Sequence, residues 1–122
     1  MIGEKGSTLS GGQKARISFA RALYSESDIL LLDDLLSAVD VHVGKFMMTE
    51  TLLKYVRDKT RILVTHALYY LKYVDKVIIM EEGRIVEQGS YEKIRNSARF
   101  REIYDAMMKD EKKKRSESVD LL

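Results

Sequence analysis

The sequence predicts an α/β fold in which a parallel sheet has flanking helices and is followed by a small C-terminal hairpin. Residues 29–32 and 61–65 form short apolar runs without alternation, which are typical of strands buried on both faces of a sheet. A segment with one apolar helical face separates them, so the three segments predict a βαβ unit with parallel strands. At 122 residues, with 45% hydrophobic and 33% charged residues, the chain is one small globular domain or part of one.

The first helix is expected to begin at Ser10. Ser10 and Gln13 have the spacing of a capping box, in which each side chain bonds to the backbone N–H of the other residue, and residues 15–24 follow without a helix breaker. The first strand comes next and ends in two acidic residues, Asp33 and Asp34.

A second helix is expected to be capped by Asp40. Its apolar face is predicted from helical spacing and consists of Val43, Phe46, Met47, Leu53 and Val56. The second strand, at residues 61–65, is followed directly by His66. A short helix is expected over residues 67–73, where three tyrosines at positions 69, 70 and 73 are too differently spaced to share one side.

The rest of the chain predicts a hairpin and a last helix. The hairpin strands, residues 76–80 and 84–87, flank a turn in which Gly83 can adopt a positive φ. The amphipathic last helix has its apolar residues at helical spacing, namely Phe100, Ile103, Tyr104, Met107 and Met108. Residues 1–108 are therefore assigned to the folded part, and residues 109–122 to a charged linker or disordered tail.

Composition excludes several classes of function. The 122 residues include no cysteine, which removes disulfides, thiolate chemistry and Cys-based zinc sites. Two histidines, His42 and His66, are too few for a His-rich metal site, and a net charge of +2 does not by itself indicate a nucleic-acid partner. No apolar run approaches the ~20 residues that a membrane-spanning helix needs.

Two places along the chain are suited to ligand binding. Ligands of open parallel sheets collect beyond the carboxyl ends of the strands. Asp33, Asp34 and His66 fall there, and an acid after an apolar strand is the pattern that holds magnesium in P-loop nucleotide enzymes. A solvated strand end is the alternative.

The start of the first helix is the second place. Residues 10–13 present free backbone N–H groups at the positive end of a helix dipole, which suits a phosphate. Gly11 and Gly12 would let the ligand approach the backbone closely. The alternative is a well-capped helix with no ligand.

The order of the motifs adds to this evidence. Four motifs follow one another, namely Leu9-Ser10-Gly11-Gly12-Gln13, Leu30-Leu31-Leu32-Asp33-Asp34, Ser37-Ala38-Val39-Asp40 and Val64-Thr65-His66. In this order and at these spacings they resemble the signature, Walker B motif, D-loop and switch histidine of the ATP-binding cassette (ABC) nucleotide-binding domain. The resemblance runs from about residue 2 to residue 94 and implies a partial P-loop NTPase domain with ATP and Mg²⁺ as its ligands.

The residues around the motifs are similar to one branch of this family, the first nucleotide-binding domain of the multidrug-resistance-associated (C) subfamily of exporters. Residues 2–6 ahead of the signature and the Asp33-Asp34 pair carry this similarity. In that branch a charged linker leads to the second membrane domain, and residues 112–122 would be its beginning. The usual proline after Asp34 is Leu35 here, which we expect to loosen the turn.

A phosphate-binding loop of the form G-x-x-x-x-G-K-[ST] is absent from the sequence. Gly6 and Gly11 have the right spacing, but Gly12 and Gln13 follow in place of Lys and Ser. We therefore expect the family's Walker A lysine and Q-loop to lie before Met1. The chain would then be the C-terminal part of the domain and would not hold ATP in the usual way.

The resemblance implies a role for each matching residue. Asp33 would hold Mg²⁺, Asp34 would stand where a glutamate usually activates the attacking water, and His66 would contact the terminal phosphate. Asp is shorter than Glu by roughly 1 Å of reach, a misplacement that can cost ~10²-fold in rate. The branch commonly pairs such a weak site with an active one. The D-loop residues Ser37 and Asp40, and the signature from Leu9 to Gln13, would face the ATP shared with a partner cassette.

The implied function is part of an ATP-driven exporter at the cytosolic face of a membrane. ATP hydrolysis would belong to the intact protein, and the chain alone is expected to be inactive. Its partners would be a second nucleotide-binding domain, arranged head to tail, and transmembrane domains, with no nucleic acid. Two alternatives stay open: a soluble cassette ATPase that acts on DNA or ribosomes, and a non-catalytic regulatory fragment that docks on an intact cassette.

Overall fold

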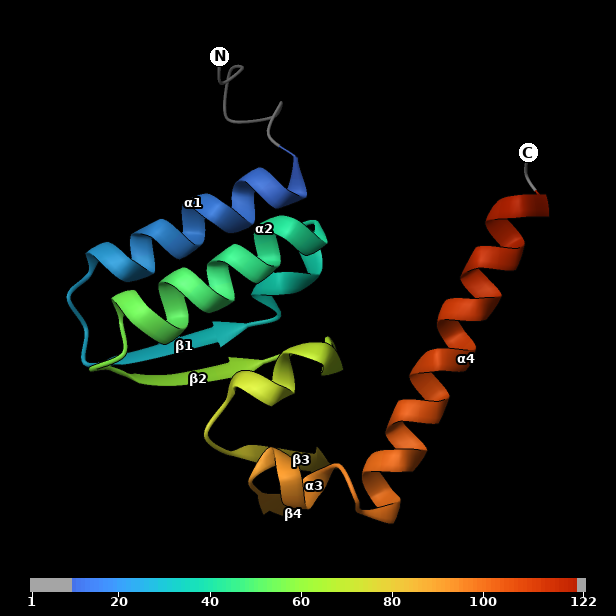
Figure 1. The fold of residues 1–122 in the computed structure, drawn as a ribbon. Coiled ribbons are helices and arrows are strands. Elements are labelled where there is room, and N and C mark those ends of the chain that lie inside the picture. The colour runs from blue at the N-terminus through green and yellow to red at the C-terminus, as the bar shows by residue number, and fades with distance from the viewer. Residues whose placement is uncertain (1–9, 121–122) are drawn as a thin grey trace. The chain divides into compact units, whose positions relative to one another are not determined.

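The computed structural model describes residues 10–120, and the chain divides after Tyr73 into two compact units. The first unit contains, in chain order, α1 (Gly11–Tyr24), β1 (Ile29–Asp33), the 3₁₀ helix η2 (Leu35–Ala38), α2 (Val41–Phe46), the π-helical segment η3 (Met47–Tyr55), β2 (Thr60–Val64) and the 3₁₀ helix η4 (Leu68–Tyr73) (Figure 1). The second unit contains β3 (Val77–Glu81), β4 (Arg84–Gly89), α3 (Tyr91–Ile94) and α4 (Ala98–Asp120). The predicted α/β class is confirmed.

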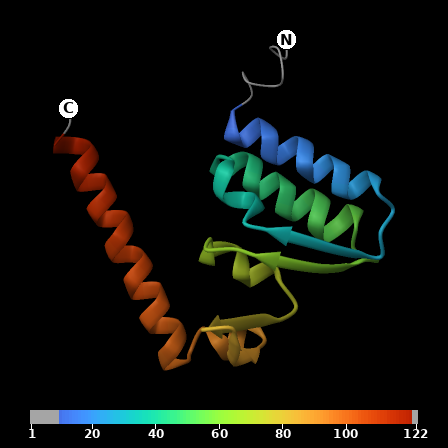
Figure 2. The ribbon, with the colours of Figure 1, turned by 180° about the vertical axis from the view of Figure 1, so that it is seen from behind.

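The βαβ unit of the first half is formed as predicted. β1 and β2 pair in parallel, with Ile29 opposite Thr60 and Asp33 opposite Val64. α1 and α2 lie side by side and cover the same face of this two-stranded sheet (Figures 1 and 2). The carboxyl ends of both strands therefore meet at one edge of the sheet.

Only one face of this sheet is buried. Leu30 and Leu32 of β1 point into the core beneath the helices, where they are 2% and 6% exposed. The other face is exposed and apolar, and we call it the open sheet face; it consists of Ile29, Leu31, Ile62 and Val64. The prediction that both strands are buried on two faces is therefore wrong for this chain, because the helices of the first unit pack on one side only.

The second helix begins where it was predicted, since the Asp40 carboxylate accepts a hydrogen bond of 2.9 Å from the Val43 N–H. From Met47 onward the backbone takes the wider π-helical winding. A wider turn shifts which residues face inward. Met47 and Val56 of the predicted apolar face are buried, and Met48 and Leu52 are buried in addition. Phe46 lies before the π-helical segment and is 63% exposed, contrary to the prediction.

The hairpin of the second unit follows the prediction. Its two-residue turn places both Glu82 and Gly83 at positive φ, 47° and 75°, as a type I′ turn requires. Ser90 ends β4 and caps α3, because its side chain accepts a hydrogen bond from the Lys93 N–H. Within this unit Phe100 of α4 is buried.

The last helix is longer than predicted. α4 continues from Ala98 to Asp120. Residues 109–120 are therefore helical, and the prediction of a disordered tail is wrong for them. The segment has no Gly or Pro and is rich in Lys, Glu and Arg, which are good helix formers, so an established helix propagates through it. Its role as a linker stays a prediction. None of the helices within residues 10–120 is both long and apolar enough to cross a membrane.

Candidate functional site

The structure brings Asp33, Asp34 and His66 to one edge of the β1–β2 sheet. Asp33 is the last residue of β1 and pairs with Val64, while the Asp34 N–H donates a 2.8 Å hydrogen bond to the Val64 carbonyl. His66 is separated from the end of β2 by Thr65 alone. All three of these side chains are exposed. The sheet edge therefore presents two carboxylates and an imidazole to solvent, in the place where parallel sheets bind ligands.

The turn after β1 is tightly held. Asp34 has a left-handed backbone (φ 53°, ψ 30°), which aspartate tolerates better than most residues. Ser37 donates to the Asp34 carbonyl from both its N–H (3.3 Å) and its Oγ (2.8 Å). A proline at position 35 would restrict Asp34 to extended conformations, and Leu35 removes that restriction. The expected loosening of the turn is therefore not observed.

A magnesium ion fits this edge only if the protein supplies some of its ligands and a bound phosphate and water supply the others. No group of three His, Cys, Asp or Glu side chains within residues 10–120 is placed to hold a metal ion. Mg²⁺ is usually bound by one or two carboxylates together with substrate phosphates and waters, and not by a cage of protein ligands. The exposed Asp33 carboxylate at the strand end suits that mode of binding.

The N-terminus of α1 is closed by the predicted capping box. Ser10 Oγ accepts a 3.1 Å hydrogen bond from the Gln13 N–H, and the Ser10 N–H donates a 2.9 Å bond to Gln13 Oε1. Because the Gln13 N–H is used by the cap, an anion at this end of the helix would meet the N–H groups of Gly11 and Gly12. Leu9, the first residue of the predicted signature, lies outside the described residues.

The two glycines of this helix start have different surroundings. A Cβ on Gly12 would lie 2.7 Å from the carbonyl oxygen of Ala38, whereas one on Gly11 would meet nothing within 4 Å. Gly12 therefore allows α1 to pack on the backbone of η2, next to the D-loop residues Ser37 and Asp40. Sequence reasoning missed this contact, because it depends on a residue that lies far away along the chain.

Of the three tyrosines that follow His66, one is buried. Tyr70 is 3% exposed, whereas Tyr69 is 56% exposed, as the spacing of these residues predicted. Burial, with a smaller effect of the neighbouring Tyr69, raises the pKa of the Tyr70 phenol to about 12. The phenol is therefore neutral at physiological pH.

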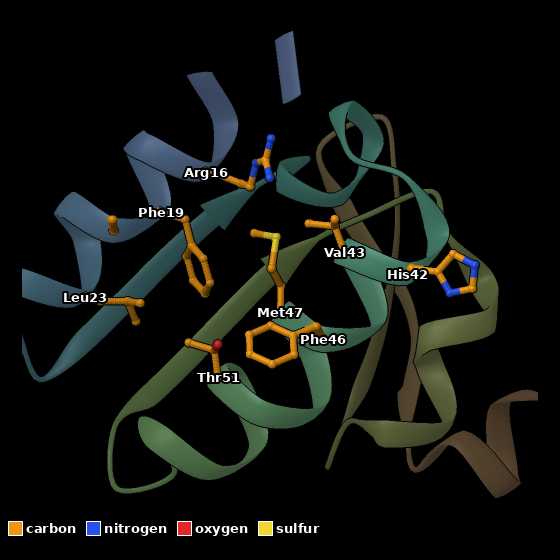
Figure 3. Close-up of a pocket in the computed structure, with 9 residues that line it drawn as sticks. Arg16, Phe19, Leu23, His42, Val43, Phe46, Met47 and Thr51 are labelled. Carbon is orange, nitrogen blue, oxygen red and sulfur yellow. The ribbon is translucent and has the colours of Figure 1, made fainter. Parts of the chain in front are cut away.

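A separate apolar groove lies between α1 and α2 (Figure 3). It has a volume of about 500 Å³ and is lined by side chains that include Phe19, Leu23, Val43, Phe46 and Met47. Arg16 and the exposed His42 also border it. None of the predicted site residues that the structure describes lines this groove, so it is distinct from the sheet edge.

Comparisons with known proteins agree with the motifs. The family model described as ABC transporter matches residues 1–37. The chain is 57% identical over 93 residues, 74% of its length, to ABC transporter C family member 8 of Dictyostelium discoideum. It is 55% identical over 75% of its length to multidrug resistance protein mrp-7 of Caenorhabditis elegans, and 55% identical over 74% to ATP-binding cassette sub-family C member 2 of Homo sapiens.

The match covers a small part of each relative, because the chain spans about 6% of the length of these three proteins. The shared region nevertheless includes most of this chain, and the matched family model ends at the turn that follows Asp33 and Asp34. The chain therefore belongs to the ABC transporter family, where it carries part of an ATP-binding domain of the type found in the C subfamily.

Proposed function

We propose that this chain is the part of an exporter's nucleotide-binding domain that supplies the side chains for Mg²⁺ binding and water activation during ATP hydrolysis. The observation that carries the proposal is the parallel register of β1 and β2, which brings Asp33, Asp34 and His66 to one sheet edge. The similarity to C-family transporters supports hydrolysis coupled to transport at the cytosolic face of a membrane.

Each residue of the edge has its own task in this proposal. Asp33 would hold the Mg²⁺, which would neutralise charge on the transferring phosphate. Asp34 would accept the proton of the attacking water, and His66 would donate a hydrogen bond to the terminal phosphate. The Asp34 carboxylate is shorter than a glutamate by one methylene, so we expect this site to be the slower one of a pair.

The start of α1 serves a second ATP in this proposal. The N–H groups of Gly11 and Gly12 lie at the positive end of a 14-residue helix, where a phosphate of another cassette's ATP is stabilised. That geometry requires a second nucleotide-binding domain, arranged head to tail. The transmembrane domains of the transporter are the other proposed partners.

The open sheet face gives a reason why the chain needs the rest of its domain. Four apolar side chains stand exposed there, and Leu31 alone is 74% exposed. Contiguous apolar surface of this kind favours association, since covering a large aliphatic side chain is worth about 1.5–3 kcal/mol. We propose that the segment carrying the phosphate-binding loop covers this face.

The test compares two substitutions in the complete protein. Asp34→Glu should raise hydrolysis at this site, because it extends the base toward the water. Asp33→Asn should weaken retention of Mg²⁺–nucleotide instead. Labelled nucleotide trapped separately on each cassette gives the site-resolved rates, and Asp58→Glu, at an exposed turn, is the matched control.

Two further variants separate the two ATP sites. His66→Ala should reduce any gain from Asp34→Glu, whereas Ser10→Arg should lower turnover of the ATP on the partner cassette. If Asp34→Glu leaves hydrolysis at this site unchanged while the domain stays folded, Asp34 does not activate the water and the assignment is wrong.

A further inference from the structure

His66 is held in a loop whose far end is anchored by a buried side chain. The Ala67 N–H donates a 3.0 Å hydrogen bond to Thr65 Oγ1, and the Tyr70 N–H donates a 3.2 Å bond to the Ala67 carbonyl. These two bonds tie the backbone on both sides of His66 into one short structure. The position of Tyr70 therefore limits where the His66 imidazole can lie.

Tyr70 is seated against a glycine of α2. A Cβ on Gly44 would overlap the Tyr70 hydroxyl, and it would also lie 3.4 Å from the ring atom Cζ and 3.5 Å from Val39 Cγ2. Gly44 is itself buried. A glycine inside a helix costs about 1 kcal/mol relative to alanine, so its presence there needs a packing reason. The space that the Tyr70 phenol requires is that reason.

Gly44 also belongs to the structure that follows Asp34. Its N–H donates a 2.8 Å hydrogen bond to the carbonyl of Asp40, the residue that caps α2. Asp40 ends the short D-loop that begins at Ser37, and Ser37 holds the Asp34 carbonyl. A continuous set of contacts thus connects the turn of Asp34 with the helix that receives Tyr70.

We propose that Tyr70, packed against Gly44, is a positioning residue that fixes the His66 loop relative to the Asp34 turn. The inference rests on the proposed function, because it assumes that His66 and Asp34 act on the same ATP. Burial favours the neutral form of a phenol over the charged form, and the raised pKa of Tyr70 is consistent with this packing. Tyr70 itself does not touch the nucleotide in this scheme.

The experiment is a double-mutant cycle in the complete protein. Gly44→Ala introduces a methyl group against the Tyr70 hydroxyl and should lower turnover at this site about tenfold, since a shift of ~1 Å can cost ~10²-fold. Tyr70→Phe removes the hydroxyl and should leave turnover within about twofold of wild type. The double variant should regain the rate of Tyr70→Phe, because the overlapping atom is gone.

The matched control is Gly89→Ala, whose new methyl group would meet only the flexible side chain of Lys93. It should leave turnover unchanged. Amide hydrogen exchange supplies a readout that does not depend on activity. Gly44→Ala should speed exchange at the amides of Ala67 and Tyr70, and the added Tyr70→Phe substitution should restore their protection.

The outcomes separate this inference from the proposed function. If Gly44→Ala keeps wild-type turnover and exchange, or if Tyr70→Phe fails to rescue it, the positioning contact is wrong. A double variant that fails to fold overturns the inference as well. If wild type hydrolyses no ATP at this site, the proposed function fails, while the exchange data still decide whether Tyr70 and Gly44 hold the loop.

Discussion

The N-terminus of α1 and the carboxyl edge of the β1–β2 sheet differ in how complete they are. At the helix start, the capping box is closed within four residues, and Gly12 is packed on Ala38. At the sheet edge, the side chains of Asp33, Asp34 and His66 are exposed, and only the backbone is held by hydrogen bonds. A helix N-terminus forms from local sequence, whereas a strand-end site depends on chain segments that are distant in the sequence.

The largest effect on aggregation and stability should come from substitutions on the open sheet face, which belongs to the same β1–β2 sheet as the strand-end site. Combining Leu31→Ser with Ile62→Thr should lower aggregation of the isolated 122-residue chain, because these side chains are exposed there. The same pair should destabilise the complete domain by about 3 kcal/mol or more, since each covered aliphatic side chain contributes about 1.5–3 kcal/mol. Light scattering and chemical denaturation measure the two effects.

The prediction requires both results together: less aggregation of the isolated chain and lower stability of the complete domain. Tyr24→Ser is the control, because Tyr24 is exposed on α1, and we expect this substitution to change neither the aggregation of the 122-residue chain nor the stability of the complete domain. If the wild-type 122-residue chain is monodisperse and melts cooperatively, the open sheet face is stable in contact with water, and this prediction is contradicted.

A smaller effect on stability should appear at the N-terminus of α1. Gly12→Ala places a methyl group against a backbone carbonyl that cannot rotate away, and overpacking of this kind costs about 1–3 kcal/mol. Gly11→Ala meets open space and should leave the free energy of unfolding nearly unchanged. Thermal denaturation of the complete domain distinguishes the two. Equal losses for both variants would mean that Gly12 does not carry the packing of α1 on η2.

The smallest effect is a pH dependence that comes from Tyr70 of η4. The folded pKa of Tyr70, about 12, lies above the ordinary value of 10.0. The unfolded state therefore loses its proton first, and the contribution of Tyr70 to stability is full below pH 10 and declines as the pH rises toward 12. Tyr70→Phe should flatten the stability–pH curve in that window. Parallel curves for wild type and Tyr70→Phe would contradict the burial of an ionisable phenol.

Local patterns predicted most of the elements. The capping box at Ser10, the cap at Asp40 and the hairpin turn at Gly83 are each decided by residues within a few positions of one another. The meeting of Asp33 and His66 at one sheet edge was predicted from the βαβ topology, which joins two strands that are about 30 residues apart.

Distant contacts account for what the sequence did not predict. The exposure of Leu31 and of Phe46 depends on what lies opposite each side chain in space, and the π-helical winding from Met47 onward was not signalled by the helical spacing of the apolar residues. The roles of Gly12 and Gly44 depend on Ala38 and Tyr70, which are far away in the sequence. A glycine inside the predicted helix was the one available signal for Gly44.

We propose that the sheet edge of Asp33, Asp34 and His66 is one part of an ATP site, and that the phosphate-binding loop of this site is not among these 122 residues. Calorimetric titration of Mg²⁺–ATP tests it most directly, with the purified 122-residue chain and its more soluble Leu31→Ser/Ile62→Thr variant compared with the complete domain. We expect micromolar binding by the complete domain, weakened by Asp33→Asn, and no micromolar binding by either form of the short chain. Micromolar ATP binding by the clean 122-residue chain would contradict it.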